Sequence, residues 1–101
     1  MPFQPTVYIV TNKPYGTPYI GVTSNPVQRI HQHREGVVPG FTRKYHLKRL
    51  VYFQQFGTME LAIAREKQLK NWHRPWKINL IEAANPQWRD MAEDLGFSPL
   101  R

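Results

Sequence analysis

Three short runs of β-branched and aromatic residues stand out along the chain. They span 6–11, 19–23 and 50–56 and read TVYIVT, YIGVT and LVYFQQF. Runs of this length and composition predict β-strands. Pro14 and Gly16 lie between the first two runs, and both residue types are typical of turns. We therefore expect a β-hairpin at the start of the chain and a third strand near its middle.

Helix signals follow the hairpin and the third strand. Pro26, directly after a Ser-Asn pair, suits the first position of a helix, and Gly36 suits its end. Further helices are expected over 59–72 and 77–84, with one or two helical turns over 88–95. The order β-β-α-β-α-α predicts an α+β domain in which helices flank a small antiparallel or mixed sheet.

Length and composition narrow the class of protein. The 101 residues suit a single domain, 1–101. The chain has no cysteine, which excludes disulfides, thiolate metal sites and a cysteine nucleophile, and which fits the cytoplasm. No apolar run approaches the roughly 20 residues of a membrane span, and the first ten residues lack the features of a signal peptide. We expect a cytoplasmic protein that does not enter a membrane.

Positive charge is concentrated in the middle of the chain. The formal net charge is +7, and residues 26–77 hold 11 Lys and Arg against 3 Asp and Glu, a net of +8. Such a field attracts nucleic acid, although the same charge can serve solubility alone. Interleaved aromatic residues favour nucleic acid, because rings and cations together suit bases and phosphates. These aromatic residues are Phe41, Tyr45, Tyr52, Trp72 and Trp76.

Glu66 has an unusual position in the long predicted helix. Helical spacing places it on one line with Ala62 and Leu69, so it lies near the apolar side. A carboxylate removed from water needs a partner. Two partners are open: an ion pair with a neighbouring Arg or Lys, or a hard divalent cation such as Mg²⁺. Spacing alone favours the ion pair.

Four further residues have side chains suited to phosphate chemistry. Arg29 and His33 lie one turn apart on the first predicted helix, where an Arg fork can grip a phosphate and a His can move a proton. Tyr8 and Tyr19 lie on the paired strands, and the small Gly21 leaves space beside Tyr19 that could admit a ligand or another backbone. The ordinary alternatives are a solvated helix face and strand packing.

Taken in order, these residues resemble the GIY-YIG nuclease superfamily. The YIG half of its motif is intact, whereas Thr6 stands at the position of the first glycine. The stretches YIGVTSNPVQRIHQH, FTRKYHLKRLVYF, AIAREKQLKNW and LIEAANPQW are similar to small single-domain members, and to the N-terminal catalytic module of the UvrC repair nuclease. Some members have lysine directly after YIG, where this chain has Val22. The resemblance covers a core of about 5–90 and leaves 91–101 as a short tail.

The resemblance implies a three-stranded antiparallel sheet flanked by helices, and a role for each residue. Tyr8 and Tyr19 would line the site, one of them as general base or as the group that positions water. Arg29 would bind the scissile phosphate, and His33 would assist proton transfer. Glu66 would hold one divalent ion, Mg²⁺ or Mn²⁺, that acts as a Lewis acid.

The superfamily also has a polar residue late in the domain, often asparagine. Asn85 is our candidate for it, and Asn79 is the alternative. The expected catalytic residues are therefore Tyr8, Tyr19, Arg29, His33, Glu66 and Asn85.

The expected activity is metal-dependent endonucleolytic hydrolysis of DNA, with RNA left open, in repair or recombination. The substrate would be chosen by its structure or single-stranded character, or by a targeting protein. The alternatives are a nucleic-acid-binding module without catalysis, and an interaction domain that docks a partner through 88–95. The residues expected to contact nucleic acid are Gly21, Arg43, Lys44, His46, Lys48, Arg49 and Lys70.

Overall fold

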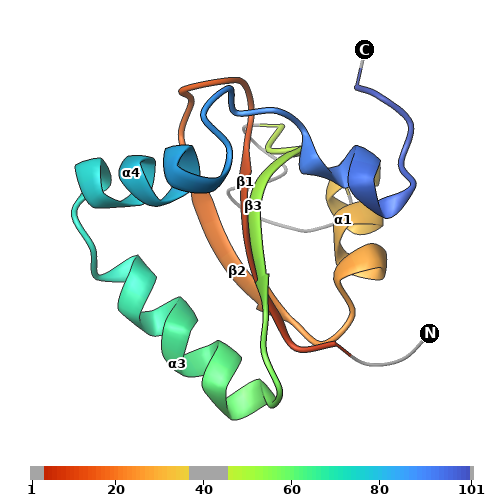
Figure 1. Ribbon diagram of the computed structural model, residues 1–101. Coiled ribbons are helices and arrows are strands. Elements are labelled where there is room, and N and C mark those ends of the chain that lie inside the picture. The colour runs from red at the N-terminus through yellow and green to blue at the C-terminus, as the bar shows by residue number, and fades with distance from the viewer. Residues whose placement is uncertain (1–3, 37–45, 101) are drawn as a thin grey trace.

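A three-stranded antiparallel sheet forms the centre of the protein in a computed structural model, which describes residues 4–36 and 46–100 (Figure 1). Its strands are β1 (Thr6–Thr11), β2 (Tyr19–Thr23) and β3 (Arg49–Gln55), in the order β2-β1-β3. Both neighbours of β1 run antiparallel to it, which confirms the predicted hairpin. The register places Tyr8 opposite Gly21 and Val10 opposite Tyr19, so these four residues share one face.

The helices are α1 (Pro26–Glu35), α3 (Met59–Lys70), α4 (Arg74–Ala84) and the short 3₁₀ helix η1 (Met91–Leu95). As predicted, α1 begins at Pro26, where the Asn25 side chain accepts a hydrogen bond from the Gln28 amide. α4 begins three residues before the predicted start, because Pro75 occupies its first turn. No helix in the described part of the chain has the length and apolar character needed to cross a membrane.

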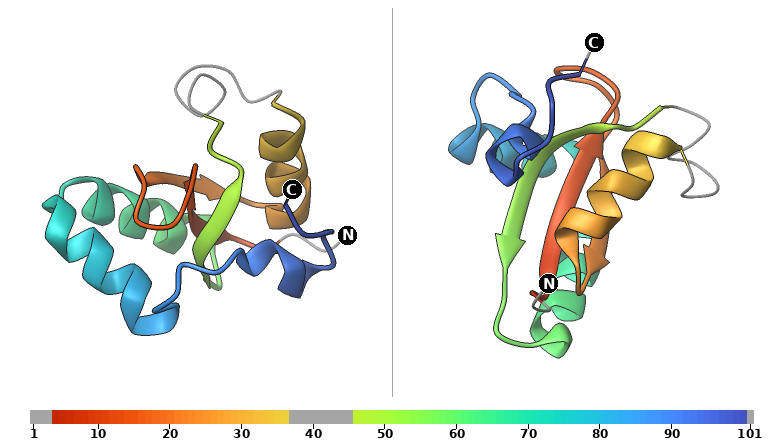
Figure 2. Two further views of the ribbon diagram at one scale, coloured as in Figure 1. Left: turned by 90° about the horizontal axis from the view of Figure 1, so that it is seen from above. Right: turned by 90° about the vertical axis from the view of Figure 1, so that its right-hand side faces the viewer.

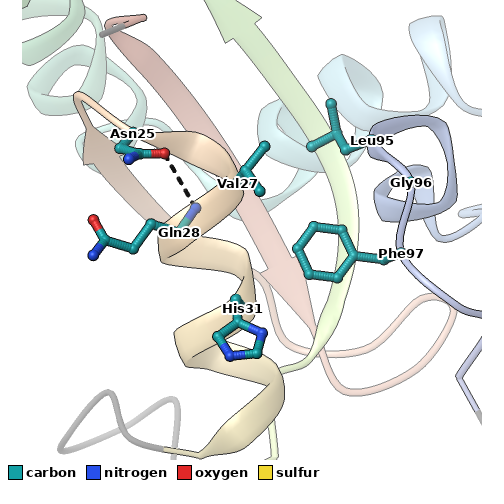
Figure 3. Close-up of a pocket in the computed structure, with 7 residues that line it drawn as sticks. All are labelled: Asn25, Val27, Gln28, His31, Leu95, Gly96 and Phe97. Atoms are coloured by element: carbon teal, nitrogen blue, oxygen red, sulfur yellow. Dashed lines mark hydrogen bonds between the residues drawn. The ribbon is translucent and has the colours of Figure 1, made fainter. Parts of the chain in front are cut away.

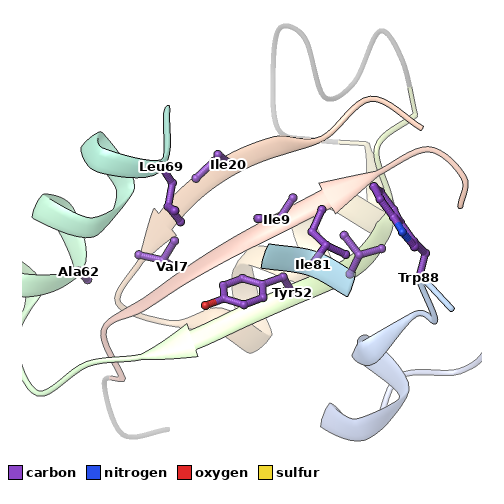
Figure 4. Close-up of a cluster of buried hydrophobic side chains, with 9 residues drawn as sticks. Val7, Ile9, Ile20, Tyr52, Ala62, Leu69, Ile81 and Trp88 are labelled. Atoms are coloured by element: carbon purple, nitrogen blue, oxygen red, sulfur yellow. The ribbon is translucent and has the colours of Figure 1, made fainter. Parts of the chain in front are cut away.

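Helices cover both faces of the sheet. α3 and α4 lie on one face, and α1 and the C-terminal segment with η1 lie on the other (Figures 1 and 2). Side chains from all three strands meet α3 and α4 in one cluster of buried residues (Figure 4). Its members are Val7, Ile9, Ile20, Val51, Tyr52, Ala62, Leu69, Ile81 and Trp88.

A second cluster of buried residues fills the opposite face. It joins β1 and β3 to α1 and η1, and its members are Tyr8, Val10, Ile30, Leu47, Leu50 and Ala92. Leu95 and Phe97 pack against it. The core therefore extends past residue 90, whereas the sequence left 91–101 as a short tail. The packing of residues after 90 on the sheet could not be inferred from the local pattern of apolar and polar residues.

Asp90 ties the C-terminal segment to the second cluster. Its buried carboxylate forms an ion pair with Arg34 of α1. The same carboxylate accepts hydrogen bonds from the main-chain amides of Leu50 in β3 and Ala92 in η1, at 3.1 and 3.2 Å. One side chain thus joins a helix, a strand and the C-terminal segment, on the face that carries Tyr8.

We expect Asp90→Ala to lower the free energy of unfolding by about 3 to 5 kcal/mol, because it leaves the Arg34 guanidinium without its buried partner. Urea unfolding measures this loss. Asp94→Ala is the matched control, since it breaks an ion pair with Arg89 whose two side chains are about half exposed, and its effect should be within experimental error. Equal losses in the two variants would contradict this view of Asp90.

Candidate functional site

Tyr8 is the centre of a group of polar side chains on the α1 face of the sheet. Its ring is buried, and its hydroxyl lies 3.0 Å from Nε2 of His33. A Cβ atom on Gly21, directly opposite, would lie 2.4 Å from Cζ and Oη of Tyr8. The space that the sequence left open beside Tyr19 for a ligand is therefore filled by the Tyr8 ring. Gly21 serves to admit that ring.

α1 brings Arg29 and His33 to this group. The residues are one turn apart, and His33 is buried against the tyrosines. Its ring centroid lies 5.4 Å from that of Tyr8 and 6.3 Å from that of Tyr19, in edge-on arrangements. The Arg29 charge acts on the pKa values of both Tyr8 and His33, which places its guanidinium beside the pair. The sequence left open the alternative that His33 lies on a solvated face of the helix, and its burial shows that it does not.

α3 contributes Glu66 and Lys70 at the edge of the sheet next to β2. The Lys70 ammonium lies 3.5 Å from a Glu66 carboxylate oxygen, and 6.0 Å from the centroid of the Tyr19 ring. Glu66 is mostly buried and its charge acts on the Tyr8 pKa, whereas Lys70 is half exposed. The ion pair that spacing favoured for Glu66 is therefore present. It lies within electrostatic reach of the Tyr8 hydroxyl.

The electrostatics hold Tyr8 and His33 in their neutral forms. Burial raises the pKa of Tyr8 to about 12, against the opposing effect of Arg29 and with smaller contributions from Tyr19 and Glu66. Burial, together with the Arg29 charge, lowers the pKa of His33 to about 4. At neutral pH the pair is a phenol beside a neutral imidazole. In the tautomer with its proton on Nδ1, the imidazole accepts the Tyr8 hydroxyl hydrogen at Nε2.

The carboxylate of Glu66 could hold a divalent metal ion only if a bound substrate supplied further oxygen ligands. Within residues 4–36 and 46–100, no three His, Cys, Asp or Glu residues are grouped so as to hold a metal. Mg²⁺, however, commonly takes one or two carboxylates and completes its shell with waters and substrate phosphates. Glu66 offers one carboxylate at a partly exposed edge, and its present partner, Lys70, is a mobile type of side chain. The residues fit such a one-carboxylate site.

Other predicted residues lie elsewhere or carry structural hydrogen bonds. The Arg49 Nε donates to the Trp88 carbonyl oxygen at 2.7 Å, which fixes this side chain against the C-terminal segment. Lys48 is half-buried, and His46 is exposed with a φ of 55°. Arg43 and Lys44 lie outside the described residues. The structure thus gathers Tyr8, Tyr19, Gly21, Arg29, His33, Glu66 and Lys70, and it does not bring Arg49 to them.

Asn85, the expected catalytic asparagine, is buried at the end of α4. Its side-chain amide donates to the carbonyl oxygens of Val51 and Arg89, at 3.1 and 2.7 Å, and its oxygen accepts from the Arg89 amide. All of these bonds hold main chain, so the structure gives Asn85 a structural role. The alternative, Asn79, is exposed on α4 beside Trp72 and Trp76.

A separate hollow lies between α1 and the C-terminal segment, with a volume of about 500 Å³. Leu95 and Phe97 face Val27 across it (Figure 3). The remaining lining residues are Asn25, Gln28, His31 and Gly96. The lining contains no arginine, lysine or carboxylate, so we place phosphate chemistry at Tyr8 rather than here.

Two features were missed from the sequence. The first is Asp90, which contacts Leu50 and Arg34 on the face of the sheet that carries Tyr8. These partners are 40 and 56 positions away in the sequence, and no local pattern marks such distant contacts. The second is a hollow at the junction of α3 and α4 that includes Trp76 and Leu80. The sequence named Trp76 only as a ring suited to nucleic acid. The i, i+4 spacing of Trp76 and Leu80 was the available signal, since it places the two side chains on one stripe of α4.

Comparison with known proteins identifies the family of the chain. A family model described as the GIY-YIG catalytic domain matches residues 4–79. A UPF0213 protein from Staphylococcus haemolyticus is 34% identical over 76 residues, which are 75% of this chain and 92% of that protein. A UPF0213 protein from Haloquadratum walsbyi is 33% identical over 64 residues, covering 63% and 72%.

A solved structure is also similar. The solution NMR structure of a UPF0213 protein from Bacillus halodurans matches with a TM-score of 0.57 and 28% identity, covering 89% of this chain and 95% of that one. This likeness agrees with the three-stranded antiparallel sheet and its helices. A GIY-YIG catalytic domain implies endonuclease activity on DNA, and such nucleases generally depend on a divalent metal ion.

The lowered pKa of His33 predicts a specific dependence of stability on pH. From pH 6.5 down to about 4, the unfolded chain binds a proton at His33 that the folded protein does not bind. The free energy of unfolding should therefore fall with pH over this range, by about 3 kcal/mol in all, and this contribution should not change further below it. Urea unfolding at a series of pH values measures the slope.

His33→Gln is the control, because it keeps a polar group at this position and removes the titration. The difference between wild type and variant isolates His33 from the carboxyl groups that titrate in the same range. Parallel curves for the two proteins would show that His33 is not held neutral by the fold.

Proposed function

The chain belongs to the GIY-YIG family, and from this premise we propose that it is a divalent-metal-dependent endonuclease that hydrolyses phosphodiester bonds in DNA. One observation carries the proposal: the buried hydrogen bond between Tyr8 and His33, with Arg29 and Glu66 acting on the same hydroxyl. A pathway for a proton, a guanidinium for a phosphate and a carboxylate for a cation thus meet at one point. These are the parts that phosphodiester hydrolysis needs.

Arg29 binds the scissile phosphate through its fork of N–H groups and stabilises the charge that develops on the phosphate oxygens. Tyr19, half-buried at the β2 edge, lines the same site. When a divalent ion is bound, it supplies Lewis-acid stabilisation of the leaving oxygen, and Glu66 is the residue that would hold it. Lys70, now paired with Glu66, would be released to contact the DNA backbone.

The Tyr8–His33 pair moves the proton. As water attacks phosphorus, its proton passes to the Tyr8 oxygen while the Tyr8 hydroxyl proton passes to Nε2 of His33. The bond between phosphorus and the leaving sugar oxygen breaks, and that oxygen takes up a proton from solvent. The tyrosine stays neutral throughout, which fits a hydroxyl with a pKa of about 12. The negative phosphate beside the pair favours the imidazolium that forms, so substrate binding offsets the low pKa of His33.

The cations of the site suit phosphate oxygens, which do not distinguish one base from another. We therefore propose that the substrate is selected by structure or single-stranded character rather than by sequence, as repair or recombination intermediates would be. The interaction-domain alternative required exposed apolar side chains in 88–95. Trp88 and Ala92 are fully buried in the two core clusters, so these two side chains offer no docking surface. Leu95 lines the hollow against α1, and its exposed apolar area is a part of this segment that a partner could contact.

Cleavage of a panel of labelled single-stranded, duplex, flap and branched DNAs tests the proposal. With Mg²⁺ or Mn²⁺ the wild-type protein should cut at least one of them, and EDTA should abolish the reaction. Glu66→Gln should slow cleavage by about 10²-fold or more, because loss of one group that stabilises transition-state charge has effects of this size.

Glu60→Gln is the matched control, since Glu60 lies exposed in the first turn of the same helix. It removes the same charge from α3 and should leave the rate unchanged. Cleavage that persists in EDTA, or an equal loss of activity in both variants, would exclude the metal role assigned to Glu66.

A further inference from the structure

A second feature lies at the junction of α3 and α4: a hollow of about 330 Å³ lined by Trp72, Trp76, Asn79 and Leu80, here called the tryptophan hollow. Trp76 is 55% exposed, and its ring meets that of Trp72 edge-on with centroids 5.8 Å apart. The third tryptophan of the chain, Trp88, is fully buried in the core. An exposed tryptophan held by ring contacts and lining a hollow adds little to the core and offers a flat ring face to a ligand.

The surroundings of the hollow are cationic. Residues 65–77 hold five Lys and Arg and a single acidic residue, Glu66. The Arg65 guanidinium lies 5.1 Å from the centroid of the Trp72 ring. Arg74, at the start of α4, donates a hydrogen bond to the Gly16 carbonyl oxygen at 3.2 Å, which fixes this junction against the β1–β2 loop. Ring faces framed by fixed cations suit a base and its neighbouring phosphates.

α3 connects the tryptophan hollow to the candidate active site along the chain. Glu66 and Lys70, which belong to that site, precede Trp72 by six and two residues. Lys70 also approaches the Tyr19 ring. A DNA strand whose phosphate is held at Arg29 and Glu66 would reach the tryptophan hollow by following α3 toward its C-terminal end.

We propose that the tryptophan hollow holds an unpaired base of a DNA strand next to the cleaved phosphate. The identity of the strand rests on the proposed function. A paired base offers no free ring face, because its neighbours in the duplex cover both sides, whereas an unpaired base can stack on Trp76. The substrate class is thus a single strand, a flap or a branch with an unpaired nucleotide beside the cleavage position.

Binding in EDTA tests this proposal without any need for cleavage. The probe is a labelled single strand of about twelve nucleotides, within the size range that such surfaces cover, compared with the duplex of the same sequence. Trp76→Ala should weaken binding of the single strand about tenfold, and Trp76→Phe should retain most of the affinity. Both variants should bind the duplex as wild type does.

Two controls make the result specific to stacking. Leu61→Ala truncates another exposed apolar side chain, 58% exposed on α3, and should leave the affinity for the single strand unchanged. A strand of the same length with abasic sugars keeps the phosphates and removes the bases. Wild type and Trp76→Ala should bind this abasic strand equally, since only the cations contact it.

The outcomes separate this proposal from the endonuclease proposal. If Trp76→Ala binds the single strand as wild type does, or loses as much affinity for the abasic strand, the tryptophan hollow is not a base site and its ligand is sought among proteins. If Trp76→Ala selectively loses affinity for bases while wild type cleaves none of the DNA panel, the base site stands and the nuclease proposal falls. Failure of wild type to bind any DNA overturns both.

Discussion

The candidate site depends on the contact between the Tyr8 hydroxyl and His33. The pairing of β1 with β2 places Tyr8 opposite Gly21, and only a residue without a side chain leaves room there for the phenol ring. The ring then reaches across to α1, where His33 meets it at 3.0 Å. Because both groups are buried, their neutral forms are favoured, and their hydrogen bond is protected from competing water. The fold thus buries a hydrogen-bonded pair of a phenol and an imidazole in the core.

Charged groups surround this neutral pair at the edge of the sheet. Arg29 comes from α1 and the Glu66–Lys70 ion pair comes from α3, so helices from opposite faces meet beside β2. The proposed phosphate would lie among these charged groups at the edge, because a buried charge at Tyr8 or His33 would be costly. The ion pair of Asp90 with Arg34 secures the C-terminal segment on the same face of the sheet as Tyr8. Core packing therefore supports α1, which places Arg29 and His33 beside Tyr8.

The sequence predicted the strands and the start of α1 well, because β-branched runs and the cap before Pro26 are local signals. It placed the start of α4 too late, since Pro75 was read as preceding the helix rather than belonging to its first turn. It also named the residues that surround Tyr8, although their roles are proposals. It could not show that Tyr8 fills the space over Gly21, because strand register is set by the whole sheet. Nor could it find Asp90, whose partners are distant in the chain.

The most direct test of this account is a double-mutant cycle on the cleavage rate, with Tyr8→Phe, His33→Gln and the double variant. If the two residues act as one proton pathway, the double variant should be no slower than the slower single variant. The control cycle pairs His33→Gln with Tyr52→Phe, since Tyr52 is a buried tyrosine on the opposite face of the sheet. In this control, the effects of the two substitutions on the cleavage rate should be independent. If the double variant instead lost the product of the two single losses in cleavage rate, the account would be contradicted, because each residue would then act without the other.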